Sequence, residues 1–313
     1  MVPVIDGVNK ILLTVGCSFS ALYYHKDPAE SYTVRLAKEL NMKLINLNCP
    51  GGSPRTIFRL LHQYLENPIH GVPDFVFVQL PFAFRQEYWV DKMEGHHRRL
   101  GYRMNKNEFL SDRLEWAVFD PKKNKTHFND GKATQESWDR LKETIIAVTR
   151  VEVFSPEKIE DTLDPDSKPD QFYLSVNDIH PKLTVAHNIH FAERSHRIIE
   201  LHTYARLIEQ LLESKSLKYC YVETDYDPSI PDSTCFIDEL LTGNPGGPEN
   251  QDEIEQAYEF AKTLCSKKHF IPYVGINPNS TTFKNDNYKC NHPGSESHRA
   301  FTDTILPEIK KRL

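Results

Sequence analysis

Short apolar runs alternate with helical periodicity in the first 80 residues, and this alternation constrains the fold more than any other feature of the sequence. The apolar runs, which have the length and composition of buried strands, lie at 11–15, 43–47 and 75–80. Apolar residues recur at helical intervals between them, over 31–41 and 54–66. The order β-α-β-α-β is typical of a parallel sheet with right-handed crossovers, so the sequence predicts an α/β fold.

The first apolar run ends in a serine. Gly16, Cys17 and Ser18 follow it directly. In open parallel sheets, ligands and reacting groups collect at the carboxyl edge, because loop amides and helix N-termini converge there. We therefore predict that Ser18 is a nucleophile. The alternative is a Gly-Cys-Ser turn that serves only to reverse the chain and cap a helix.

A histidine near the other end of the sequence suits the base that such a serine needs. His292 is followed by Pro293 and then by a helical pattern that runs to Leu313. A loop histidine restrained by a proline, just ahead of a terminal helix, suits a general base that reaches a serine from another strand. Ser18 and His292 together predict nucleophilic catalysis.

These two regions resemble the SGNH (GDSL-like) hydrolase family, in which a serine after the first strand pairs with a histidine just before the last helix. The first block of the family usually reads Gly-Asp-Ser; Gly16–Phe19 reads Gly-Cys-Ser-Phe, similar to a branch common in bacterial and phage genomes. The second block is a glycine preceded by an asparagine five positions earlier, and Asn46 and Gly51 have that spacing. The resemblance covers residues 10–90 and 215–313.

The resemblance implies a flavodoxin-like three-layer α/β/α sandwich with a parallel five-stranded sheet, the SGNH hydrolase fold, and a large insertion. We expect residues 1–90 and 191–313 to form this domain. Residues 91–190 are expected to form an insertion or cap that shapes substrate access, or else a surface or partner-binding lobe. The remaining strands are predicted at 217–223 and 270–275, and the remaining helices over 191–215, 251–266 and from 134 or 137 to 150.

The glycine loop of the second block has a chemical interpretation. The resemblance implies that the backbone amides of Gly51 and its neighbour Gly52, with the amide of Ser18, donate to the oxyanion formed when a carbonyl is attacked. Losing one such donor typically costs about 3 kcal/mol of transition-state stabilisation. The alternative is an ordinary Pro-Gly-Gly turn.

Two positions depart from the family pattern. Ala83 stands near the place of the asparagine that supplies the remaining oxyanion donor, so Gln79 or Arg85 is the candidate replacement. Arg85 would favour anionic substrates, or it forms a salt bridge with a surface acid instead. Lys289 stands where the family has the aspartate that orients the histidine, and Asp286 is the nearest acid before it.

Charge and composition exclude several classes of function. The 313-residue chain has a net charge of −6 and a pI near 6.2, which argues against a nucleic-acid partner held by phosphate contacts. It has no 18-residue apolar stretch, and its N-terminus has neither the basic nor the apolar region of a signal peptide. We therefore expect no membrane partner and a cytoplasmic location; the resemblance to phage-encoded relatives raises a virion or a phage-infected cell as the alternative.

Cysteines and histidines give no sign of a metal centre. The six cysteines follow neither disulfide-scaffold nor metal-ligand spacing. The histidines of the middle region, at 96, 97, 180, 187 and 190, suit no single metal site. The sequence therefore predicts no metal and no cofactor, and it does not predict the oligomeric state.

Two functions fit these features. The first is a serine ester hydrolase, an esterase or deacetylase acting on acylated carbohydrate or small esters through Ser18, His292 and an acid such as Asp286. The second is a catalytically degenerate SGNH fold that acts as a glycan-binding or assembly module, favoured by Ala83 and Lys289. A Ser18 that faces His292 would favour the enzyme, and a buried or blocked Ser18 would favour the module.

Overall fold

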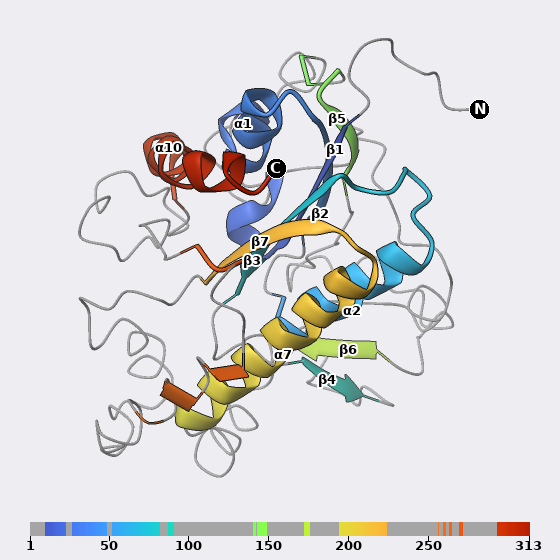
Figure 1. The fold of residues 1–313 in the computed structure, drawn as a ribbon, viewed down its shortest axis with the longest axis vertical. Coiled ribbons are helices and arrows are strands. Elements are labelled where there is room, and N and C mark those ends of the chain that lie inside the picture. Colours follow the sequence, from blue (N-terminus) through green and yellow to red (C-terminus); the bar gives the residue numbers. More distant parts are fainter. Residues whose placement is uncertain are drawn as a thin grey trace, which may run out of the picture.

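A computed structural model of the chain describes the elements that surround the predicted nucleophile. The described residues are 10–22, 27–48, 52–81, 87–90, 140–141, 143–148, 172–175, 194–223, 256, 259–260, 263–264, 269–271 and 293–313. They contain a five-stranded sheet flanked by helices and a separate two-stranded sheet (Figure 1).

The larger sheet is parallel throughout, as the β-α-β-α-β pattern predicts. Its strands are β1 (Ile11–Gly16), β2 (Lys43–Asn48), β3 (Phe75–Leu80), β5 (Ile145–Val148) and β7 (Lys218–Glu223), in the spatial order β5-β2-β1-β3-β7. The smaller sheet pairs β4 (Glu87–Val90) with β6 (Phe172–Ser175) in antiparallel register. β1, which leads to Ser18, is therefore the central strand of the larger sheet.

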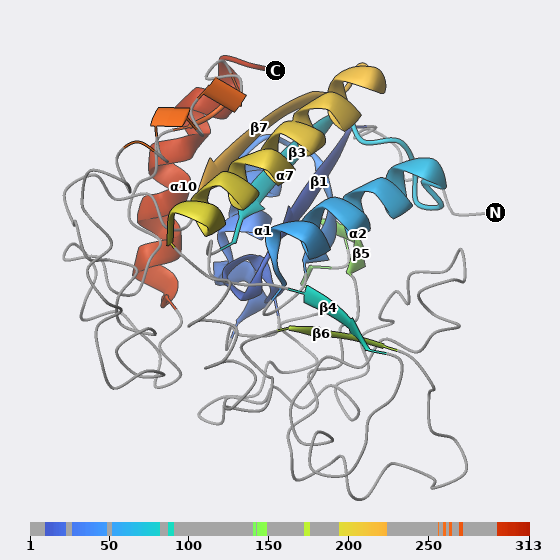
Figure 2. The same cartoon turned by 90° about the horizontal axis from the view of Figure 1, so that it is seen from below.

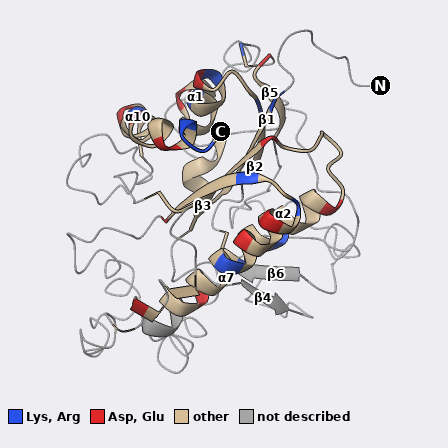
Figure 3. Ribbon diagram, in the orientation of Figure 1, with Lys and Arg blue, Asp and Glu red and all other residues tan. Residues whose placement is uncertain are grey.

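Helices cover both faces of this sheet and complete three layers. α1 (Tyr32–Glu39) and α10 (Ser295–Lys310) lie on one face, and α2 (Pro54–Glu66) and α7 (Arg194–Ser214) on the other (Figures 1 and 2). Charged residues of both signs lie along the helices, whereas the strands carry charge only at their ends (Figure 3). Strands buried on both faces must be apolar along their length, which is the pattern seen in the sequence.

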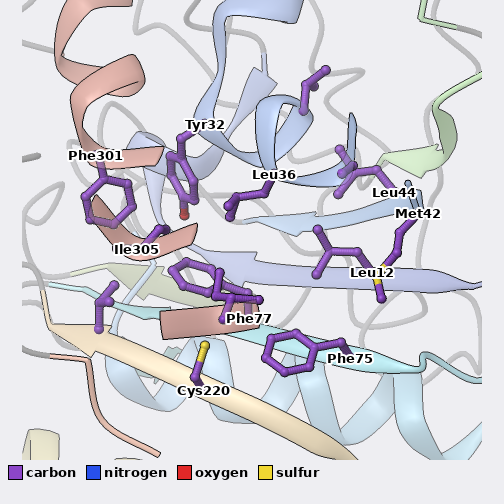
Figure 4. Packing of buried hydrophobic residues seen from close by; sticks show 14 of the residues in the cluster. Leu12, Tyr32, Leu36, Met42, Leu44, Phe75, Phe77, Cys220, Phe301 and Ile305 are labelled. Carbon is purple, nitrogen blue, oxygen red and sulfur yellow. The ribbon is translucent and has the colours of Figure 1, made fainter. Parts of the chain in front are cut away.

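Each face of the sheet packs against its own pair of helices. Successive strand residues point to opposite faces, so Leu12 joins the core under α1 and α10 while Leu13 joins the core under α2 and α7. The first of these cores also contains Phe75, Phe77 and Phe301 (Figure 4). Both helix pairs therefore hold β1 and its neighbours from the two sides.

Most predicted elements are confirmed. Strands 43–47, 75–80 and 217–223 match β2, β3 and β7, and helices 31–41, 54–66 and 191–215 match α1, α2 and α7. Asn41, predicted to end the first helix, has a φ of 51°, a conformation that stops helical propagation.

The helix predicted from 134 or 137 to 150 is wrong, because Ile145–Val148 forms strand β5 at the edge of the sheet. Its apolar residues fit helical spacing, but three of the four residues of β5 are β-branched. Ile145, Ala147 and Val148 pair with β2, so tertiary pairing overrides the local pattern. Among the described residues the sheet thus has five strands, and one of them, β5, comes from the range predicted as an insertion. The domain boundaries at 90 and 190 stay a prediction.

The segment predicted as the last strand, 270–275, is described only at its start. Phe270 forms an isolated parallel bridge with Tyr221 of β7. The Tyr221 amide donates to the backbone carbonyl of His269 at 3.0 Å, and the Ile271 amide donates to the backbone carbonyl of Tyr221 at 2.9 Å. Residues 272–275 lie outside the described residues, as does most of the helix predicted over 251–266, of which 256, 259–260 and 263–264 are helical.

Candidate active site

Ser18 lies in a tight turn at the carboxyl end of the central strand. β1 ends at Gly16, and a single turn of 3₁₀-helix, Ser18–Ser20, follows Cys17. The Ser20 amide donates to the Cys17 carbonyl at 3.0 Å, and the Ala21 amide donates to the Ser18 carbonyl at 3.2 Å. Ser18 is 5% exposed. The predicted nucleophile therefore occupies a defined position on the expected edge of the sheet, in largely buried surroundings.

Gly16 allows the turn to approach the neighbouring strand β3. A Cβ atom at this position would lie 2.5 Å from Ser20 Oγ and 2.7 Å from Gln79 Oε1. Both separations are far inside van der Waals contact. Because any side chain at position 16 would push these groups apart, the glycine of the first block is required by packing.

Gln79, near the end of β3, fixes the serine turn through side-chain hydrogen bonds. Its Oε1 accepts from the Cys17 amide at 3.1 Å and from Ser20 Oγ at 2.6 Å. Its Nε2 donates to Cys17 Sγ at 3.2 Å. The Gln79 amide thus contacts the residues on both sides of Ser18.

Ser20 and Tyr32 link the turn to helix α1. Ser20 Oγ is hydrogen-bonded to the Tyr32 hydroxyl, and both side chains are buried. The Tyr32 ring packs edge-on against Phe77 and Phe301, with ring centroids 5.7 and 4.9 Å away. Burial raises the pKa of the Tyr32 hydroxyl well above its usual range, so this group stays protonated.

Helix α10 contacts the start of α1 through a buried histidine. The Tyr32 amide donates to Nδ1 of His298 at 3.1 Å, and the two rings stack with centroids 5.7 Å apart. His298 lies in the first turns of α10 and is 1% exposed. The N-terminal part of the last helix is therefore bonded to the element that follows the serine turn.

Asn46 of the second block supports the same turn from β2. Its Nδ2 donates to the Ser20 carbonyl at 3.1 Å and to Thr33 Oγ1 at 3.3 Å. The side chain thus bridges β2, the serine turn and α1. This gives the asparagine of the second block a structural role beside the glycine that it precedes.

The second block continues into helix α2 at the same edge. Ser53 caps this helix: its Oγ accepts from the Thr56 amide at 3.1 Å, and Thr56 Oγ1 accepts from the Ser53 amide at 3.2 Å. Gly52, one of the predicted oxyanion donors, is buried just before the cap. The partial positive charge of a helix N-terminus favours negative charge that develops at this edge.

The other predicted site residues lie outside the described residues. These are His292, Asp286, Gly51 and Arg85. The described chain resumes at Pro293, which is buried together with Gly294 directly before α10. The catalytic roles of the whole predicted set remain proposals.

Ser20, Tyr32 and His298 contact the serine turn or α1 but were not predicted from the sequence as part of the site. Helical spacing offered a signal for the last of these, because His298 precedes Phe301 and Ile305 by three and seven residues on the buried face of α10. Nothing in the local pattern indicated the polar contacts of Ser20 and Tyr32.

A buried histidine–glutamate pair lies at the carboxyl end of β7. His202 Nε2 of α7 is 3.0 Å from Glu223 Oε1, and each side chain is 6% exposed. Nδ1 of the same ring lies 2.8 Å from the carbonyl oxygen of Ile198. Because both ring nitrogens face acceptors, the His202 and Glu223 side chains together hold two protons.

Among the described residues, no group of three or more His, Cys, Asp or Glu side chains is arranged to hold a metal ion. No helix in the described part of the chain has the length and apolar character needed to cross a membrane.

Solved structures that match this chain include carbohydrate esterases. A carbohydrate esterase family 2 enzyme with a carbohydrate-binding domain, from Myceliophthora fergusii, is 10% identical with a TM-score of 0.41; the match covers 99% of this chain and 68% of that one. An acetyl xylan esterase from the rumen bacterium Butyrivibrio proteoclasticus is 10% identical with a TM-score of 0.38, covering 98% and 65%.

A lipolytic protein of the G-D-S-L family from Desulfitobacterium hafniense is 8% identical, with a TM-score of 0.33 and coverage of 96% and 99%. This chain therefore spans about two thirds of the length of the two carbohydrate esterases and nearly all of the third protein. No protein-family model and no curated protein matches the sequence.

Proposed function

We propose that the chain is an SGNH-type serine hydrolase that cleaves carboxylic esters, with acylated carbohydrate or small esters as substrates. The observation that carries the proposal is the position of Ser18. The serine lies in a turn at the carboxyl end of the central strand, and Gln79, Asn46 and Tyr32, through Ser20, hold that turn from three elements. A turn fixed in this way would hold the serine in one orientation toward a substrate, which supports the proposal.

In the proposed reaction, Ser18 Oγ attacks the acyl carbonyl carbon while His292 takes the hydroxyl proton. The amides of Ser18, Gly51 and Gly52 stabilise the oxyanion of the tetrahedral intermediate. Collapse of the intermediate breaks the ester bond, and His292 returns the proton to the departing alcohol. Water then attacks the acyl-enzyme in the same manner and releases the acid, so no cofactor is required.

The remaining predicted residues have supporting parts in the proposal. Asp286 is the candidate acid that orients His292, and Arg85 is the candidate for the side-chain donor that the family asparagine supplies. Gln79 was the other candidate donor. Because both polar atoms of its amide contact Cys17 or Ser20, we propose that it positions the turn instead.

One observation favours the second candidate function. Ser18 is only 5% exposed, as a serine in a degenerate site would be. In that case the fold would serve as a glycan-binding or assembly module, with the serine retained for packing.

A fluorophosphonate probe decides between the two, because it modifies only activated serines. The hydrolase is expected to be labelled at Ser18, with labelling abolished in Ser18→Ala and strongly reduced in His292→Ala. Ser214→Ala, a change at the exposed end of α7, is the matched control and should label like the wild type. A folded protein that is not labelled would contradict the hydrolase and direct the work to glycan binding.

A further inference from the structure

We propose that Gln79, Ser20, Tyr32 and His298 form a buried positioning relay that couples the Ser18 turn to the first turn of α10, and so sets the geometry between the nucleophile and its base. The inference rests on the proposed function for its catalytic consequence. The contacts themselves are properties of the fold, and each member of the relay acts through others rather than on the substrate.

The first link has a defined orientation at Gln79. A backbone amide can only donate, so the atom that faces the Cys17 N–H at 3.1 Å must be the carbonyl oxygen of the Gln79 side chain. The same oxygen lies 2.6 Å from Ser20 Oγ. Because a carbonyl oxygen cannot donate, Ser20 must give its hydroxyl proton to Gln79.

The direction of the second link follows from counting protons. The Ser20 hydroxyl has one proton, and Gln79 takes it. The Tyr32 hydroxyl must therefore donate to Ser20 Oγ. The raised pKa of Tyr32 keeps its proton in place, and Figure 4 shows its hydroxyl directed toward the sheet between Phe301 and Leu36. The Tyr32 hydroxyl thus donates to Ser20 Oγ, and the Ser20 hydroxyl donates to Gln79 Oε1.

The third link joins α1 to α10 and is also directional. The Tyr32 amide belongs to the first residue of α1, where an N–H has no partner inside its own helix. Ser31, at the N-cap, makes no side-chain capping bond, and Nδ1 of His298 accepts the Tyr32 amide instead. An accepting Nδ1 carries no proton, so His298 is neutral with its proton on Nε2. A histidine of the last helix thus caps the first.

One end of the relay contacts the residues on both sides of Ser18, and the other end lies shortly after His292 in the sequence. Cys17 and Ser20 stand on either side of Ser18, and His298 follows His292 by six residues in the sequence. Tyr32 connects the two ends, through its amide on one side and its hydroxyl on the other. A change of one atom at Tyr32 should therefore alter catalysis without touching the substrate.

Tyr32→Phe tests the relay, because it removes the hydroxyl that is hydrogen-bonded to Ser20 Oγ. We expect the fluorophosphonate labelling rate of Ser18 to fall about 10- to 100-fold, the range expected when a reacting group is displaced by up to about 1 Å. With p-nitrophenyl acetate as substrate, kcat should fall while KM stays constant. Tyr64→Phe is the matched control, because it removes a buried hydroxyl that donates to the Gly71 carbonyl at 2.6 Å, at the opposite edge of the sheet.

Two substitutions of His298, one of them conservative, test the α10 end of the relay. His298→Leu should slow labelling as Tyr32→Phe does, whereas His298→Asn, whose Oδ1 can take the place of Nδ1, should restore most of the rate. Equal rates in both His298 variants, or a folded Tyr32→Phe protein that labels like Tyr64→Phe, would overturn the relay. Should Tyr32→Phe fail to fold, Ser20→Ala breaks the same link and carries the same expectation.

Hydrogen exchange separates the failure of the relay from the failure of the proposed function. If the wild type neither labels nor hydrolyses, the hydrolase proposal fails, but the relay still predicts faster exchange of the Cys17 amide in Tyr32→Phe and not in Tyr64→Phe. Unchanged Cys17 exchange in Tyr32→Phe would refute the relay whatever the activity of the wild type.

Discussion

Gly16→Ala should destabilise the protein by about 2–4 kcal/mol, because the new methyl group has no room between the serine turn and β3. It would lie 2.5 Å from Ser20 Oγ, 2.7 Å from Gln79 Oε1 and 2.9 Å from Gln79 Cβ. Optimal separations for such contacts are about 3.5–4 Å, so both neighbours must move.

The magnitude is the sum of two effects. Overpacking a buried site typically costs about 1–3 kcal/mol. Moving Ser20 away from Gln79 also breaks a buried hydrogen bond, which adds about 1 kcal/mol. Because Gln79 Cβ is close to the backbone of β3, rotation of one side chain cannot relieve the whole overlap.

Urea unfolding followed by circular dichroism measures this effect, and a double-mutant cycle identifies its source. Ser20→Ala removes the nearest atom, so Gly16→Ala should be less destabilising in that background, with a coupling of about 1 kcal/mol or more. A Gly16→Ala protein as stable as the wild type, or strictly additive effects, would refute the steric argument.

Three further predictions concern titratable groups that are buried or, in the case of His70, half-buried. Leaving one member of the His202–Glu223 pair without its partner, as in His202→Leu, should lower the free energy of unfolding by about 3–5 kcal/mol, and adding Glu223→Met should recover part of the loss in urea titrations. Burial lowers the pKa of His70 below its ordinary value of 6.5, so the unfolded chain binds a proton more readily; stability should fall as the pH drops below that value, and less steeply in His70→Gln than in the wild type, as unfolding at pH 7.5 and 5.5 would show. Burial raises the pKa of the Cys220 thiol, so iodoacetamide at pH 8 should modify it only after denaturation, and peptide mapping that finds it modified in the native protein would contradict its buried position.

The elements of the main sheet could be predicted because their signals are local. β3 is an almost unbroken apolar run, and α2 has a proline at its first residue and a regular apolar face. β5 could not be predicted in this way: its four residues fit helical spacing, and their strand conformation depends on pairing with β2, about 100 residues away in the sequence.

In the candidate site, too, the residues with a local sequence signal could be predicted and those that depend on tertiary contacts could not. Ser18 follows a strand that can be recognised from sequence, so its place at the carboxyl edge was predictable. The part played by Tyr32 was not, because its polar partners come from the serine turn and from a helix 266 residues away. Which polar atoms meet in a buried network is decided by tertiary packing, which local periodicity does not report.

That separation of 266 residues also bears on the order in which the chain folds. β1, β2 and β3 lie within the first 80 residues and can pair early, whereas contacts between distant segments form late because closing long loops is entropically unfavourable. During synthesis, the face of the sheet that α10 covers stays uncovered until residues 295–310 have left the ribosome. Tyr32 then lacks the histidine that caps its helix, so a nascent chain would hold a formed sheet and an unassembled site. Any activity would therefore appear only after α10 has emerged and docked, and chaperones that bind exposed apolar surface would find it on the Phe77 face before then.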